Sequence, residues 1–81
     1  MKLPRNLNAK DLIKSAEKLG YVATRQVGSH IRMTTQQNGQ HHITIPNHNP
    51  IRIGTLSSIL GDIAAHFKTS KEEMISLLFN K

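Results

Sequence analysis

The stretch that decides the fold is YVATRQVGSHIRMTT, residues 21–35. It holds two runs of strand-forming residues, 21–27 and 31–35, and His30, directly before the second run, takes the first position of its strand. The runs are joined by Gly28 and Ser29, and a two-residue connection that begins with glycine is typical of a type II′ hairpin turn. The stretch therefore predicts two antiparallel strands with a tight turn between them.

The turn also fixes which residues face each other. With a two-residue loop, Val27 faces His30 and Arg25 faces Arg32, and facing residues lie on the same side of a sheet. The hairpin would then have one open face and one core face. The residues expected on the open face are His30, Arg25, Arg32 and Thr34, and those expected on the core face are Val22, Thr24, Ile31 and Met33.

A second hairpin follows, and its loop length decides where its apolar residues point. A two-residue loop would place Ile43 and Ile45 on the face of His30 and split the core. A three-residue loop over 37–39, with Gly39 in the left-handed position of a bulged turn, keeps both isoleucines in the core. This register pairs Met33 with Ile43 and Ile31 with Ile45, and it places His42 and Thr44 on the His30 face.

Three helices are predicted around the hairpins. The first begins after Asn8, with Asp11 supporting its first turn, and ends at Gly20. The second is expected to be capped by Thr55, and the third opens at Ser70. Their apolar stripes are Leu12, Ile13, Ala16 and Leu19 in the first helix, Leu56, Ile59, Leu60, Ile63 and Phe67 in the second, and Met74, Leu77 and Leu78 in the third.

The predicted fold class is α+β: a single domain over residues 1–81 with the order α-β-β-β-α-α. Helices would cover one face of a three-stranded antiparallel sheet and leave the other face to solvent. The chain has no cysteine, which excludes disulfides and zinc–thiolate sites. It shows neither a signal-peptide pattern nor a membrane-spanning stretch, so we expect a cytoplasmic protein with no membrane partner.

The composition points to a polyanionic partner. Lys and Arg number 11 against 5 Asp and Glu, which gives a formal net charge of +6. Such a balance favours nucleic acid first, an acidic protein second and a membrane surface third.

The open sheet face is the expected place of chemistry, because Arg25 faces Arg32 there beside His30. Like charges directly opposite each other cost stability, and local rules are often broken at functional sites. Two guanidinium groups can hold a phosphate, with Ser29 and its backbone N–H helping to position it. An imidazole can accept or donate a proton near neutral pH. These groups suffice for metal-independent RNA cleavage; the alternative is a solvated polar face.

Other basic residues leave alternatives open. One face of the first helix, carrying Lys10, Lys14 and Lys18, is either simply solvated or follows phosphates. His48 lies in a loop and is either a surface residue or a phosphate contact. His41 and His42 are adjacent in a strand and point to opposite faces, so they cannot share one metal ion, and we predict neither a metal site nor a cofactor.

Taken in order, these residues resemble the HicA family of bacterial toxin–antitoxin toxins, also called the YcfA-like mRNA interferases. The most specific parts are the Gly28-Ser29-His30 turn and the segment that leads from Pro46 and His48 to Gly54-Thr55-Leu56. The resemblance runs over nearly the whole chain and also includes Leu3-Pro4, Leu19-Gly20-Tyr21, Arg25-Gln26-Val27, Ile43-Thr44-Ile45 and Ile59-Leu60.

The resemblance implies a double-stranded-RNA-binding-domain-like α-β-β-β-α fold, to which this chain adds a C-terminal helix. It implies ribosome-independent cleavage of mRNA, a catalytic histidine at the position of His30, and neutralisation by a HicB-type antitoxin. Members that are free of this partner block translation and growth. The stretch 61–69 is about one helical turn longer than we expect for the family, so the second helix is predicted to extend.

The leading hypothesis is therefore an mRNA endonuclease with His30 as general acid or base. Arg25 and Arg32 would hold the phosphate, and Gly28 and Ser29 would shape the turn. RNA-binding roles are predicted for Lys10, Lys14, Lys18 and His48. A non-catalytic double-stranded RNA-binding module and a protein-interaction module are the alternatives.

Overall fold

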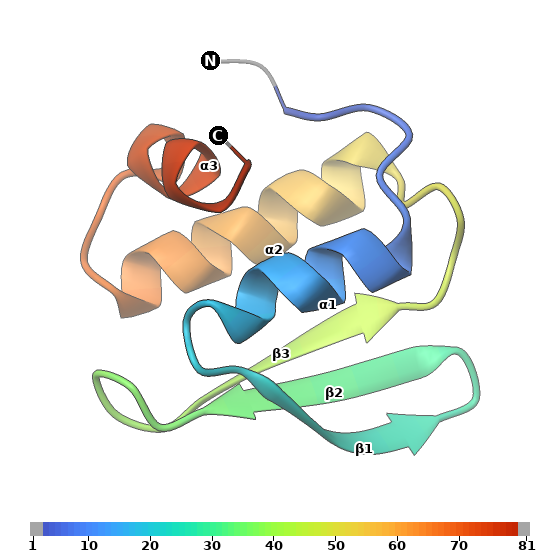
Figure 1. Ribbon diagram of the computed structural model, residues 1–81, viewed down its shortest axis with the longest axis horizontal. Helices are drawn as coiled ribbons and strands as arrows, with labels where there is room; N and C mark the ends of the chain where they lie inside the picture. The colour runs from blue at the N-terminus through green and yellow to red at the C-terminus, as the bar shows by residue number, and fades with distance from the viewer. Residues whose placement is uncertain (1–2, 80–81) are drawn as a thin grey trace.

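Three helices lie on one side of a three-stranded antiparallel sheet in the computed structural model, which describes residues 3–79 (Figure 1). Residues 1, 2, 80 and 81 of the predicted domain lie outside the described part. The predicted order α-β-β-β-α-α is confirmed, and the strands lie in the order β1-β2-β3. The elements are α1 (Ala9–Glu17), β1 (Val22–Val27), β2 (His30–Thr35), β3 (His41–Pro46), α2 (Ile53–His66) and α3 (Lys71–Phe79).

The two turns set the register that the sequence predicts. Gly28 has a φ of +59°, which suits the first central position of a type II′ turn, and Gly39 also takes a positive φ, of +93°. The strands on both sides of these turns are paired as expected. The confirmed pairs are Val27–His30 and Arg25–Arg32 between β1 and β2, and Met33–Ile43 and Ile31–Ile45 between β2 and β3.

Strand β1 departs from the prediction upstream of Arg25. The register shifts between Ala23 and Arg25, so that Thr24 is an extra residue in a β-bulge. One extra residue turns every side chain before it to the other face. Val22 and Thr24 were predicted on the core face, and this was wrong: Val22 faces Thr34 and is 57% exposed, and Thr24 is also exposed.

The core lies between the helices and the β2–β3 half of the sheet, and every residue of β1 is exposed. Leu77 was predicted in the apolar stripe of α3, and this was wrong, because Leu77 is 59% exposed and Ile75 is buried in its place. The helix therefore packs with a slightly rotated face. The largest fully buried side chains are Tyr21, Leu12, Met33, Ile45, Leu56, Leu60, Ile63, Met74, Leu78 and Thr35.

Two of the helix starts follow the predicted capping chemistry. The Asn8 N–H donates to the Asp11 carboxylate at 3.2 Å before α1, and the Glu73 N–H donates to the Ser70 hydroxyl at 3.1 Å before α3. These contacts satisfy donors that have no partner within the helix.

The start of α2 differs from the prediction. Thr55 was expected to cap this helix, and this was wrong, because α2 begins at Ile53 with Arg52 at the N-cap position. The reason lies just upstream, where Ile51 is buried and its N–H donates to the Leu7 carbonyl at 2.8 Å. The helix thereby begins three residues earlier than predicted, and Thr55 falls inside its first turn. Within residues 3–79, no helix is both long and apolar enough to cross a membrane.

Candidate functional site

His30 lies at the first residue of β2, directly after the turn, with its side chain on the face of the sheet that the helices leave uncovered. Arg25 and Arg32 are Cα partners on the same face. The three residues line one open cavity of about 190 Å³, together with Val27 and Thr44. The structure therefore brings together the histidine and the two arginines that the sequence predicted as a site.

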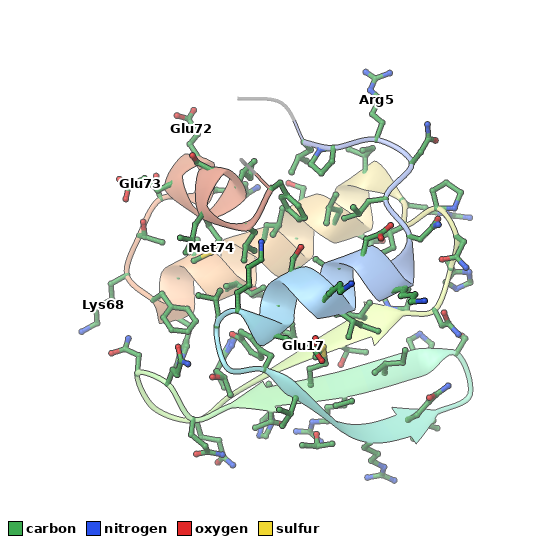
Figure 2. All side chains as sticks on the ribbon, viewed as in Figure 1. Arg5, Glu17, Lys68, Glu72, Glu73 and Met74 are labelled. Atoms are coloured by element: carbon green, nitrogen blue, oxygen red, sulfur yellow. The ribbon has the colours of Figure 1, made fainter. Side chains whose placement is uncertain are left out.

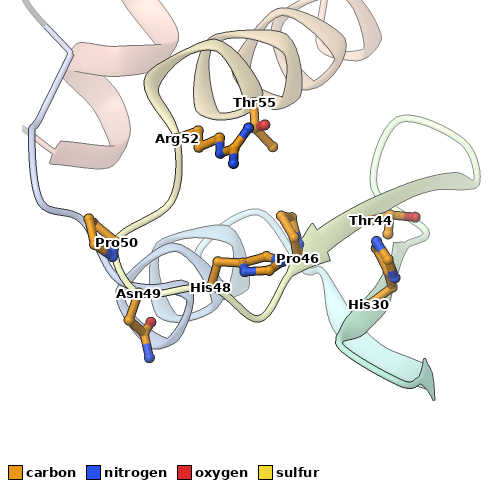
Figure 3. A pocket seen from close by; sticks show the side chains of 8 residues that line it. All are labelled: His30, Thr44, Pro46, His48, Asn49, Pro50, Arg52 and Thr55. Atoms are coloured by element: carbon orange, nitrogen blue, oxygen red, sulfur yellow. The ribbon is translucent and has the colours of Figure 1, made fainter.

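A second and larger cavity, of about 530 Å³, lies on the other side of His30 (Figure 3). It is bounded by the end of β3, the loop that follows it and the start of α2. Its lining residues are His30, Thr44, Pro46, His48, Asn49, Pro50, Arg52 and Thr55. His30 and Thr44 line both cavities, so the imidazole lies on the border between them.

Two hydrogen bonds fix the loop over 47–52, one to the turn before His30 and one to the start of α1. The Asn47 N–H donates to the carbonyl of Ser29, which ties this loop to the β1–β2 turn. Two residues later, the side-chain oxygen of Asn49 accepts a hydrogen bond from the Ala9 N–H at 3.1 Å. His48 lies between these two anchors, and it reaches the same cavity as His30 for that reason.

The charge around the two cavities is positive. The sequence has no acidic residue between Glu17 and Asp62, a stretch that contains all three strands and the loop over 47–52. The acidic Glu72 and Glu73 project outward from α3, on the part of the molecule remote from the sheet (Figure 2). A polyanion that approaches the open sheet face therefore meets arginine and histidine side chains without a nearby carboxylate.

The two histidines of β3 lie outside both cavities of His30. His42 lies on the open face, where its Nδ1 is 2.7 Å from the hydroxyl of Thr34; it lines neither cavity of His30 but shares another cavity with Arg25 and Arg32. His41 lies on the opposite face, with its Nδ1 2.7 Å from the Tyr21 hydroxyl. The two rings thus point to opposite faces, as predicted. Within residues 3–79, no group of three or more metal-ligating side chains comes together.

The predicted lysine row is not part of this site. Lys14 and Lys18 line a separate cavity of about 550 Å³ beside the end of α3, and the Lys18 ammonium donates to the Leu78 carbonyl at 3.2 Å. Lys10 is exposed at the start of α1 and lines neither cavity of His30. Because α1 packs on the covered face of the sheet, the row runs along the helical layer.

Sequence reasoning missed Arg52 and the position of Thr55 in the larger cavity. Arg52 follows a proline-rich loop and lies outside the apolar stripes of the predicted helices, so no periodic pattern indicated the direction of its side chain. One signal was available, because the segment from Pro46 to Thr55 belongs to the stretch that carries the family resemblance. That segment indicates a shared role without showing which side chains meet.

Comparison with known families gives a match. The family model for the HicA toxin of bacterial toxin–antitoxin systems matches residues 9–64, which is more than half of the chain. The match runs from the start of α1 through most of α2 and includes every residue of the two cavities; α3 lies beyond it. No significant match to a curated protein or to a solved structure was found.

Proposed function

Because the chain belongs to the HicA toxin family of bacterial toxin–antitoxin systems, we propose that it is an endoribonuclease that cleaves mRNA in the cytoplasm, with His30 as its acid–base residue. The observation that carries this proposal is the open cavity that His30 shares with Arg25 and Arg32. A guanidinium fork binds a phosphate through two parallel hydrogen bonds, and an imidazole transfers protons near neutral pH.

The proposed reaction is a transesterification. The ribose 2′-oxygen attacks the adjacent phosphorus while its proton passes to a base, and the bond from phosphorus to the 5′-oxygen breaks while that oxygen receives a proton. The products are a 2′,3′-cyclic phosphate and a free 5′-hydroxyl. His30 carries out one of the two proton transfers, and Arg25 and Arg32 stabilise the negative charge that builds up on the phosphate oxygens.

The turn residues support this chemistry by position. Gly28 gives the tight connection that starts β2 at His30, and Ser29 links the turn to the next loop through its carbonyl. No step in this scheme uses a metal ion, so we expect cleavage to persist in the presence of EDTA. Loss of activity in EDTA would contradict the scheme.

RNA binding would extend beyond the cavity. His48 lines the larger cavity beside His30, which supports a contact with the RNA. The lysine row of α1 lies on the other side of the sheet from His30, so it would bind only RNA long enough to pass from the open sheet face to the helices. These lysines are Lys10, Lys14 and Lys18.

The decisive experiment replaces His30 with alanine and compares RNA cleavage with RNA binding. Removal of a general acid or base lowers the cleavage rate by about 10²–10⁴, and binding to an uncleavable 2′-deoxy oligonucleotide should persist. His42→Ala is the matched control, because His42 lies on the same face and beside the same two arginines but lines neither cavity of His30. Unchanged cleavage by His30→Ala would refute the assignment. A wild-type protein that binds double-stranded RNA without cutting it would support the binding-module alternative.

The partner of the proposed toxin is a HicB-type antitoxin. Expression of the wild-type chain should arrest growth, His30→Ala should not, and co-expression of the protein encoded in the adjacent reading frame should restore growth. Co-purification of the two proteins tests the complex directly. A neighbour that neither binds nor restores growth would refute the partner assignment.

A further inference from the structure

The two cavities that meet at His30 differ in size. The cavity with Arg25 and Arg32 is about 190 Å³, and the one with Arg52 is about 530 Å³. Sites for small organic ligands span roughly 300–1,000 Å³. By this measure the smaller cavity has room for a phosphate group, and the larger one has room for a whole nucleotide.

The walls of the larger cavity offer the two kinds of contact that a nucleotide needs. Arg52 and Thr55 line the cavity from the start of α2, and His48 lines it from the loop that follows β3 (Figure 3). A guanidinium binds phosphate oxygens, and flat aromatic rings, including imidazole, stack on nucleic-acid bases.

The charge of Arg52 is also unopposed along its own helix. The one acidic residue in α2 is Asp62, nine residues after Ile53. At 1.5 Å of rise per residue this is about 14 Å along the axis. The first N–H groups of a helix, which have no acceptor within it, add partial positive charge at the same end.

We propose that the larger cavity is a subsite for the first nucleotide beyond the two that flank the cleaved bond, with Arg52 binding the phosphate that joins it to the chain and His48 stacking on its base. This inference rests on the proposed function. When the scissile phosphate occupies the smaller cavity, the chain continues past His30, which lines both. The first nucleotide beyond the cleaved pair then enters the larger cavity. The enzyme therefore recognises at least one residue of RNA beyond the bond that it cuts.

Short oligonucleotides with a single ribose at the cleaved position test this subsite. A dinucleotide spans only the cut bond, and two trinucleotides extend it by one deoxynucleotide on the 5′ or the 3′ side. One stacked base contributes roughly a 5- to 150-fold gain, so one of the two trinucleotides should exceed the dinucleotide in kcat/KM by that factor. Arg52→Gln and His48→Ala should lower this ratio towards one.

Arg5→Gln is the matched control, because Arg5 projects to solvent from the N-terminal segment, remote from the sheet (Figure 2). It should keep the wild-type ratio. Two outcomes overturn the subsite. In the first, neither extension raises the kcat/KM of the wild-type protein. In the second, Arg52→Gln lowers kcat/KM by the same factor for the dinucleotide and for the trinucleotides. Thermal denaturation of each variant separates a binding defect from unfolding.

Failure of the proposed function is distinguishable from failure of the subsite. If the wild-type protein cuts none of these oligonucleotides, the cleavage proposal fails. The subsite is then tested by oligonucleotide binding alone. The NMR signals of His48 and Thr55 should shift when an all-deoxy trinucleotide is added and shift much less with the dinucleotide. Equal shifts, or none, would refute the subsite.

Discussion

The hydroxyl oxygen of Tyr21 lies 2.7 Å from Nδ1 of His41, and this hydrogen bond joins the entry of β1 to the first residue of β3. The His41 ring is stacked on His66 of α2, with ring centroids 4.4 Å apart and planes 10° apart. Nε2 of His66 donates to the Gln37 carbonyl at 2.8 Å. This aromatic cluster fastens the β2–β3 hairpin to the end of α2, on the face of the sheet opposite His30.

The cluster predicts an alkaline transition. Burial, with a smaller contribution from the Asp62 carboxylate, raises the pKa of Tyr21 to about 12. Above pH 10 the unfolded chain loses the phenol proton while the folded chain keeps it, so the free energy of unfolding should fall between pH 10 and 12. Tyr21 is the single tyrosine and tryptophan is absent, which makes the absorbance titration specific. A titration midpoint near 10 would contradict the prediction, and Tyr21→Phe should remove this part of the pH dependence.

The same cluster predicts sensitivity to acid. Burial, followed by the neighbouring His66, lowers the pKa of His41, with a smaller contribution from His42 in the same direction and an opposing one from Asp62. As the pH falls below about 6.5, an unfolded imidazole takes up a proton more readily than His41 does, so stability should decrease. Denaturant melts between pH 7.5 and 5 should show this slope, and His41→Gln should flatten it. His48 lies in an exposed loop, so His48→Gln should keep the pH dependence of the wild-type protein. Equal slopes of stability against pH in the wild type, His41→Gln and His48→Gln would contradict the prediction for His41.

The facing arginines predict a trade between stability and activity. Each of Arg25→Gln and Arg32→Gln removes a like-charge pair across β1 and β2, which should raise the free energy of unfolding by about 0.2–1 kcal/mol at low salt. The gain should shrink in high salt, because both side chains are exposed. Both variants should cleave RNA more slowly. Arg5→Gln is the control, because it removes a positive surface charge remote from this pair. Slower cleavage without a gain in stability would argue against repulsion between Arg25 and Arg32.

Two glycines should differ in their tolerance of alanine. Gly28 has a positive φ, but an added Cβ would meet no atom within 4 Å, so Gly28→Ala should cost only the backbone strain, about 1–2 kcal/mol. At Gly20 the φ is +82° and a Cβ would lie 2.9 Å from the Thr35 hydroxyl. That hydroxyl is buried and bonded to the Leu19 carbonyl at 2.7 Å, so it cannot give way. Gly20→Ala should therefore lose clearly more stability, as measured by chemical denaturation; equal losses would contradict this.

The part of the site that the sequence predicted is local. Arg25, His30 and Arg32 come together because a two-residue turn fixes the pairing on both of its sides, and turn chemistry is written in adjacent residues. The part that escaped prediction depends on contacts distant in sequence. Arg52 and His48 share a cavity with His30 through the Asn47–Ser29 and Ala9–Asn49 hydrogen bonds, which no periodic pattern encodes.

The helices show the same division. The buried stripe of α1, with Leu12 and Ala16 fully covered, follows helical spacing and was predictable. Spacing also places the lysines on one face, but the side of the molecule to which they belong depends on how α1 docks. In α3, Met74 and Leu78 are buried as predicted. Whether Ile75 or Leu77 is buried beside them depends on how the helix is rotated about its axis when it packs, and helical spacing alone does not decide this.

The bulge at Thr24 makes one residue of β1 dispensable to the hairpin. Ala23 already pairs with Met33 and Arg25 with Arg32, so deletion of Thr24 would leave every other pair in place and turn the bulge into a regular ladder. Deletion of a residue between Arg25 and Gly28 would instead turn that arginine to the face of the sheet opposite His30. The bulge thus divides β1 into two parts. At the bulge, the loss of one residue leaves the pairing intact, whereas between the bulge and Gly28 the number of residues fixes the face to which Arg25 points.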